Sequence, residues 1–180
     1  MPGTQWQKGS AAPRENGNMT DLELDHMAFG ALDLEQGIER MSALLGAPPV
    51  GGGRHALFGT HNALWRVETG DEPVYLEVIA ADPDGPRPSR KRWFGLDDPQ
   101  VRRRLEKGVH LLSLVVRCTD FAKGRAMLPD DPGPPVAVSR GALRWQFSLA
   151  GDGGLIQAGA SPYLIAWADD ARPALYMPEQ

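Results

Sequence analysis

The chain has 180 residues with a hydrophobic fraction of 42% and a charged fraction of 23%, a composition typical of one globular domain or two small modules with a shared core. Its net charge of -4 argues against general nucleic-acid binding, and no apolar run reaches the ~18 residues that a membrane span needs. The single cysteine, Cys118, excludes a disulfide within the chain and, with no secretory signal evident, predicts a cytoplasmic protein.

The first predicted elements are a tail, a strand and a capped helix. Residues 1–20 are rich in Gly, Pro, Ser, Asn and charged side chains, which cannot bury a core, so we predict a disordered tail. Residues 22–31 (LELDHMAFGA) are mostly apolar on both faces, a pattern typical of a central strand. Asp33 then supplies a helix N-cap, and Gly46 supplies the left-handed residue that ends the helix.

The middle of the chain predicts more strands and then a connector. Residues 60–68 and 74–81 are predicted strands, and 51–57 is a candidate for a short additional one. The segment 83–108 is first Pro-rich and then basic, which is typical of a connector. Its last part, DDPQVRRRLEKG, predicts a short helix with Asp at the N-cap and Pro at the first helical position.

The second half of the chain predicts the same kinds of element again. Asp120 is a suitable N-cap for a second short helix, which must end before Pro129. The stretches around this helix that have strand-like composition are 110–118, 135–141, 142–151 and 154–167.

The order of elements indicates an internal repeat. When Asp33 is placed on Asp120, the offset is 87 residues (120 − 33), and HMAFGA then falls on SLVVRC. Sequence identity between the halves is low, so the repeat depends on element order and hydrophobic pattern. We predict two tandem βαβββ modules, 21–82 and 109–180, joined by the connector 83–108.

Several segments together resemble a known superfamily. In chain order they are LDHMAFGALDLEQGIERMSALLG, GGRHALFGTHNALWRV, YLEVIA, RWFGLDDP and PYLIAW. This series, over residues 22–175, resembles the vicinal oxygen chelate superfamily and, within it, the glyoxalase-like domain proteins. The resemblance implies an α+β fold in which two βαβββ modules form a curled mixed sheet around a cleft, with the helices outside. In metal-using members the cleft holds a divalent ion, whose ligands come from the first and last strand of each module.

The resemblance assigns candidate roles to two residues. His26 matches the ligand position on the first strand, and Glu77 matches the position on the last strand of the first module. Imidazole and carboxylate ligands suit Zn, Mn, Fe, Ni or Co. We therefore predict His26 and Glu77 as the catalytic pair and as metal ligands, with Glu77 as a general base if no metal is held. If the prediction is right, their side-chain ends lie within about 8 Å of each other on one face of the sheet, because metal–ligand bonds are ~2.0–2.2 Å long.

The second module departs from the metal-binding pattern. At the 87-residue offset, Ser113 takes the place of His26, and PYLIAW holds no acid. His110 lies three residues too early, and an odd shift along a strand turns a side chain to the other face. Since catalytic metal sites usually have three protein ligands, a metal-free cleft is kept as an alternative of nearly equal weight.

Other residues are candidates for contact with a ligand. The stretch HALFGTHNALW places polar residues at the start of a predicted strand. Neither face of this strand is wholly polar, so the sequence does not decide which face points into the cleft. Turn chemistry explains GTHN equally well. The candidate substrate-binding residues are His55, Thr60, His61, Asn62, Trp65 and Trp93.

The sequence also gives expectations for residues outside this set. The basic connector and helix (Arg87 to Arg92, and Arg102 to Arg104) is either solvated or an anion-binding lid. Trp145 and Trp167 are expected in the core, and Cys118 is expected to be an inert buried thiol.

Three functions follow as hypotheses. The first is an enzyme of the lyase, isomerase or dioxygenase type that acts on a small oxygenated metabolite. The second is a metal-free protein that binds a small molecule, for example by sequestering an antibiotic. The third is a structural dimerisation module. A small-molecule ligand is the expected partner, with no nucleic acid and no membrane, and a homodimer stays open because the sheet has edges.

Overall fold

The computed structural model describes residues 22–70 and 72–179. The predicted tail, 1–20, lies outside these residues. The strands are β1 (Glu23–Gly30), β2 (Gly51–His55), β3 (Thr60–Val67), β4 (Val74–Ala81), β5 (His110–Arg117), β6 (Pro135–Arg140), β7 (Leu143–Ser148) and β8 (Tyr163–Trp167). The α-helices are α1 (Leu34–Leu45), α2 (Pro99–Leu105) and α3 (Phe121–Met127), and a short 3₁₀ turn, η1, covers Trp93–Gly95.

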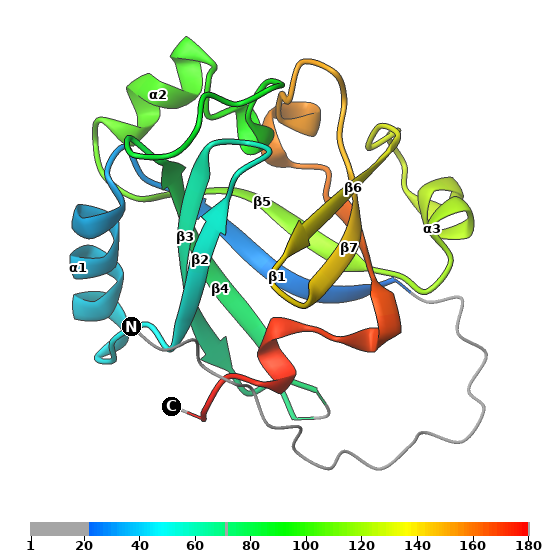
Figure 1. Ribbon diagram of the computed structural model, residues 1–180, viewed down its shortest axis with the longest axis horizontal. Coiled ribbons are helices and arrows are strands. Elements are labelled where there is room, and N and C mark those ends of the chain that lie inside the picture. The colour runs from blue at the N-terminus through cyan, green and yellow to red at the C-terminus, as the bar shows by residue number, and fades with distance from the viewer. Residues whose placement is uncertain (1–21, 71, 180) are drawn as a thin grey trace.

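All the strands join in one mixed sheet, which confirms the predicted fold class. Their order is β2-β3-β4-β1-β5-β8-β7-β6, so the predicted central strand, β1, lies in the middle beside β5. The pairs β1–β4 and β5–β8 are parallel, and the remaining pairs are antiparallel. The sheet curls until its two edges, β2 and β6, approach each other. Figure 1 shows α1 and α3 outside this curl, where α1 packs on β3 and β4 and α3 packs on β8.

The bounds of the elements reproduce the offset predicted from the sequence. β1 and β5 begin 87 residues apart, at Glu23 and His110, and α1 and α3 begin 87 residues apart, at Leu34 and Phe121. The strand order is also the same on either side of the central β1–β5 pair, which is antiparallel. An approximate two-fold axis between β1 and β5 therefore relates the two halves of the sheet.

The helix ends follow the local signals in the sequence. The carboxylate of Asp33 accepts a hydrogen bond from the backbone N–H of Gln36 (2.9 Å), and Asp120 caps α3 in the same way. Gly46 ends α1 in the left-handed region, with φ of 74°. One predicted strand was too long: within 154–167 only Tyr163–Trp167 is a strand, because a 3₁₀ turn with left-handed backbone at Gln157 comes first.

The core has two main layers. The inner layer fills the concave side of the sheet and is rich in aromatic rings, including Trp93, Phe94 and Phe147. The outer layer lies between α1 and the sheet and includes Trp65 and Met41. No helix in residues 22–70 or 72–179 has the length and apolar character of a membrane span.

Candidate functional site

A β-bulge on β1 brings an acid beside the predicted histidine. The register against β5 shifts between Leu24 and His26, so Asp25 is an extra residue on this strand. Asp25 Oδ1 lies 2.6 Å from His26 Nδ1, and Asp25 Oδ2 accepts a hydrogen bond from the indole of Trp167 (2.8 Å). The Asp25–His26 pair is buried. Burial by itself raises the pKa of Asp25, but the hydrogen bond and charge of His26, with the Trp167 hydrogen bond, outweigh it and lower the pKa.

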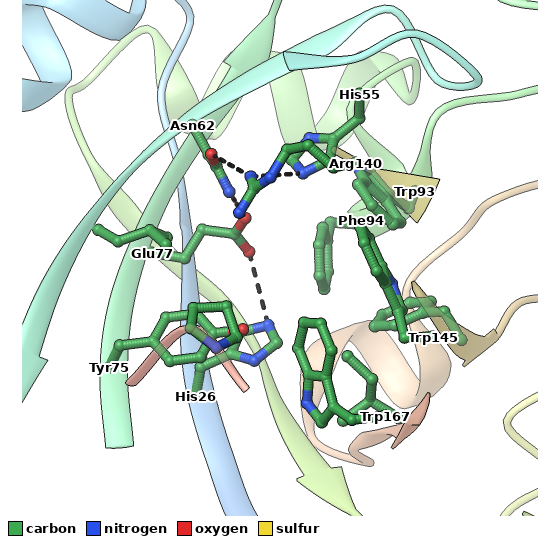
Figure 2. A pocket seen from close by; sticks show the side chains of 14 residues that line it. His26, His55, Asn62, Tyr75, Glu77, Trp93, Phe94, Arg140, Trp145 and Trp167 are labelled. Carbon is green, nitrogen blue, oxygen red and sulfur yellow. Dashed lines mark hydrogen bonds and ion pairs between the residues drawn. The ribbon is translucent and has the colours of Figure 1, made fainter. Parts of the chain in front are cut away.

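Glu77 and His26 face the same side of the sheet. Their strands are parallel neighbours, with Glu77 beside Ala28 and Tyr75 beside His26. His26 Nε2 lies 3.6 Å from Glu77 Oε2, and the Tyr75 ring stacks on the imidazole with ring centroids 4.5 Å apart (Figure 2). A single ligand atom or group can therefore touch both side chains, as the sequence predicts.

Arg140 organises the polar side chains at the other end of the site. Its Nη1 donates to Asn62 Oδ1 (3.1 Å) and also lies 3.2 Å from His55 Nε2 (Figure 2). Since a guanidinium only donates, Asn62 must turn its amide N–H to Glu77, and the Nδ2–Oε1 distance is 2.5 Å.

The same argument fixes the tautomer of His55. Its Nε2 accepts from Arg140, so the neutral ring carries its proton on Nδ1, 3.3 Å from Thr60 Oγ1. Thr60 Oγ1 also accepts from the indole of Trp93 (3.2 Å). Burial, followed by the charge of Arg140, lowers the pKa of His55 to about 3.

His55 should make stability depend on pH. Because its pKa is about 3 in the folded chain and 6.5 in the reference state, the unfolded chain binds more protons between these values. The free energy of unfolding should therefore fall as the pH falls below 6.5, by up to about 1.4 kcal/mol per pH unit. Urea unfolding from pH 6.5 to about 4.5, above the range in which Asp25 titrates, measures this slope. His55→Gln should flatten it, and an equal slope in both proteins would contradict the assignment.

These side chains line one pocket on the concave side of the sheet. The cavity volume is about 30 Å³, and one water needs ~10–15 Å³, so the space holds about two waters. Polar groups of the first module and Arg140 form one wall, and aromatic rings form the other (Figure 2). The lining residues are His26, His55, Asn62, Leu64, Tyr75, Glu77, Trp93, Phe94, Arg140, Trp145, Phe147, Ile165, Trp167 and Pro173.

The structure places some of the predicted binding residues at the pocket and others on the opposite face of β3. Four of the six candidate binding residues lie at the pocket or directly behind it: His55, Asn62 and Trp93 line it, and Thr60 holds His55 and Trp93. His61 and Trp65 lie on the opposite face of β3, where Trp65 packs under α1 and donates to the Ala47 carbonyl (3.0 Å). They do not enter the pocket, because Asn62 and Leu64 take the inward positions of this strand.

Two other predictions concern the connector and the cysteine. Arg92 donates hydrogen bonds to the Asp97 carboxylate (2.6 Å) and to the Gly59 carbonyl (3.2 Å). Neither Arg92 nor the other residues of the basic cluster line the pocket. Cys118 is only half-buried, and burial raises the pKa of its thiol to about 11. Such a thiol carries little thiolate at neutral pH, which supports an inert role.

Sequence reasoning missed several residues of the pocket. Asp25 was hidden because neighbours on a regular strand face alternate sides, and Arg140 because it comes from the other module. Tyr75 was overlooked although it lies two residues before Glu77 and therefore on the same face of β4. Trp145 lies in the inner core and Trp167 packs against it, as expected, and both side chains also line the pocket. The sequence holds two signals for these residues, the Asp-His pair itself and the spacing of two between Tyr75 and Glu77.

The donor set does not fit a metal centre of the kind that the resemblance implies. Within residues 22–70 and 72–179, no three His, Cys, Asp or Glu side chains are grouped so that they could hold an ion. The register pairs Val115 with Tyr163 where Ala28 pairs with Glu77, so the second module offers Ser113 and Tyr163 in place of His26 and Glu77. The guanidinium of Arg140 in the same pocket further disfavours a divalent cation.

We expect the protein to hold metal weakly. After loading with Zn, Mn, Fe, Ni or Co and dialysis without chelator, elemental analysis should find much less than one ion per chain. The His26→Ala, Glu77→Ala double variant is the control for adventitious ions. One ion per chain that disappears in the double variant would contradict this prediction.

A family profile described as a glyoxalase-like domain matches residues 24–180. No curated protein matches. Among solved structures, a variant of Streptomyces coelicolor methylmalonyl-CoA epimerase in complex with 2-nitronate-propionyl-CoA is 20% identical, with a TM-score of 0.50 over 85% of this chain and 100% of that chain. A hypothetical protein from Bacillus halodurans is 12% identical, with a TM-score of 0.50 over 84% of this chain and 98% of that chain. These likenesses show the fold.

Proposed function

The chain belongs to the glyoxalase-like domain family, and we propose that it is an enzyme of the isomerase type that moves a proton at a carbon next to a carbonyl group. The observation that carries the proposal is the buried Asp25–His26–Glu77 arrangement at the pocket. Buried, hydrogen-bonded ionisable groups that converge on a cavity are typical of acid–base sites. The S. coelicolor structural neighbour is an epimerase, which is consistent with this class of reaction.

Glu77 is the proposed general base. Its Oε1 is occupied by the Asn62 amide, so Oε2 is the oxygen directed to His26 and to the pocket. The amide fixes the carboxyl group in one orientation, which favours transfer from a correctly placed C–H. The proton that leaves the carbon goes to Oε2, and its electron pair moves toward the carbonyl oxygen.

His26 is the proposed partner of Glu77. Its Nδ1–H donates to Asp25, so the ring is held with Nε2 directed at Glu77 and the pocket. In its protonated form, Nε2–H donates to the carbonyl oxygen as that oxygen gains negative charge. The Asp25 carboxylate then stabilises the imidazolium, as an acid behind a catalytic histidine does in other sites. Asp25 acts through His26 and is a positioning residue.

The small volume of the pocket limits the size of the substrate. A cavity of about 30 Å³ accepts only the reacting end of a small molecule unless wall side chains move. A ligand of the size of a coenzyme A ester would have to remain largely outside this space. We therefore propose a small carbonyl compound as the substrate.

Exchange of carbon-bound protons tests the proposal. The wild-type protein is incubated in D₂O with small ketones, aldehydes and oxo acids, and loss of the proton signal next to the carbonyl is followed by NMR against a protein-free blank. Faster exchange for at least one compound supports the enzyme. Binding without exchange, detected as a rise in melting temperature, would favour the second candidate, a small-molecule binding protein, which the aromatic wall of the pocket supports.

A further inference from the structure

Arg140 crosses from the second module into the site of the first module. It is the last residue of β6, at one edge of the curled sheet, and its partners Asn62 and His55 belong to β3 and β2 at the other edge. Figure 2 shows its guanidinium above Glu77, on the far side of the pocket from His26. The charged side chain of Arg140 therefore extends from the edge strand β6 to the opposite edge of the sheet and lies next to Glu77, the proposed base.

The glycine run of β2 makes room for this crossing. An ideal Cβ at Gly53 would lie 2.9 Å from Cδ and 3.3 Å from Nε of Arg140, and real Cβ atoms essentially never come within 3.0 Å of another heavy atom. Any side chain at position 53 would push Arg140 from its place. The need for this space explains why position 53, within the sequence GGGR at 51–54, has no side chain.

The positive charge of Arg140 has no anion as its direct partner. Among the described residues it forms no ion pair, and its hydrogen-bond partners are the neutral amide of Asn62 and the ring of His55. Both bonds come from Nη1, so Nε and Nη2 keep donors for another group. A partly buried cation is normally compensated by an anion, and a guanidinium matches a carboxylate with two parallel hydrogen bonds.

We propose that the substrate carries a carboxylate beside its reacting carbonyl group and that Arg140 binds this carboxylate. The inference rests on the proposed proton transfer, since it names the substrate class of the same site. In such a 2-oxo acid the carboxylate meets Arg140, and the reacting carbon meets Glu77 and His26 at the other side of the pocket. Arg140 thus determines the preference for a substrate with a carboxylate, and the missing side chain at Gly53 leaves the space through which Arg140 reaches the pocket.

Matched substrate pairs isolate the effect of the carboxylate. Pyruvate is compared with acetone, and phenylpyruvate with phenylacetone, because each pair differs by a carboxylate in place of a methyl group. Proton exchange in D₂O gives kcat/KM for each member. The wild type should prefer the acid by roughly 10- to 100-fold, the factor expected for charge-assisted hydrogen bonds. Binding of the acids is measured separately by quenching of the pocket tryptophans.

Four variants test whether the preference for the acid over the ketone depends on Arg140. Arg140→Met should bring the acid-to-ketone ratio close to one, and Arg140→Lys should retain part of it because the charge stays but the planar fork is lost. Gly53→Ala should lower the ratio by displacing Arg140. Arg54→Met is the control, since its exposed side chain faces away from the pocket and pairs with Asp82. A merely structural Arg140 would weaken acid and ketone equally.

The outcomes separate this inference from the proposed function. Exchange of acid and ketone at equal rates would retain proton transfer and overturn the role of Arg140. Tight binding of the acid without exchange, lost in Arg140→Met, would retain the carboxylate site and overturn the enzyme. Absence of both binding and exchange for every acid would overturn the inference, as would a preference for the acid that survives Arg140→Met.

Discussion

Glu77→Gln should lower kcat for proton exchange by roughly 10²- to 10⁴-fold, the usual contribution of a positioned general base. Glutamine has the same shape, and its amide oxygen can still accept from Asn62 as Glu77 Oε1 does. Its amide nitrogen, however, cannot take a proton from carbon. KM should change little, because the substrate is held by other groups.

Two further variants give this prediction its controls. Glu77→Asp keeps the acid but withdraws it from the reacting carbon, so it should retain part of the exchange activity. Glu39→Gln on the exposed face of α1 removes a carboxylate of the same kind far from the pocket and should have no effect. Full exchange activity in Glu77→Gln, measured by the loss of the NMR signal in D₂O, would exclude Glu77 as the base.

The fold could be predicted because its signals are local and repeated. Asp33 and Gly46 set the two ends of α1 through their own hydrogen bond and φ angle. The hydrophobic pattern recurs at an offset of 87 residues, and the same offset separates the first residues of β1 and β5, Glu23 and His110. The helix ends depend on residues near each other in the chain, and the repeat can be found by comparing the two halves of the sequence, so neither requires knowledge of tertiary contacts.

The candidate site could be predicted in part, from the superfamily pattern and from the polar residues at the start of β3. His26 and Glu77 follow from the resemblance, and the structure places them 3.6 Å apart. Asp25 depends on a register shift against β5, which the sequence of β1 does not contain. Arg140 depends on how far the sheet curls, a property of all the strands together. Trp65 looked equivalent to Asn62 because β3 is buried on both faces.

Trp93→Ala should lower the free energy of unfolding by about 3–5 kcal/mol, the usual cost of removing a large aromatic side chain from a core. Trp93 is 3% exposed. Its ring stacks on Phe58 at 3.9 Å and meets the edge of Phe147 at 5.3 Å, and its N–H bonds to Thr60. Trp93 thus forms part of the pocket wall and also contacts both modules, through Phe58 and Phe147.

Urea unfolding of the wild type and three variants measures the effect. Trp93→Phe keeps a ring for Phe58 but loses the hydrogen bond to Thr60, so it should fall between wild type and Trp93→Ala. Leu44→Ala, at a side chain 77% exposed, should change stability by less than about 0.5 kcal/mol. A loss in Trp93→Ala no greater than that in Leu44→Ala would contradict the packing role.

Indole can test whether the lost stability comes from an empty space. Truncation of Trp93 leaves an apolar cavity that opens beside the pocket, and such cavities bind aromatic molecules. Saturating indole should therefore raise the melting temperature of Trp93→Ala more than that of the wild type, because a ligand that binds only the folded chain stabilises it. An equal rise in the two proteins would show that Trp93→Ala leaves no space for an aromatic ring, so that the lost stability would have another cause.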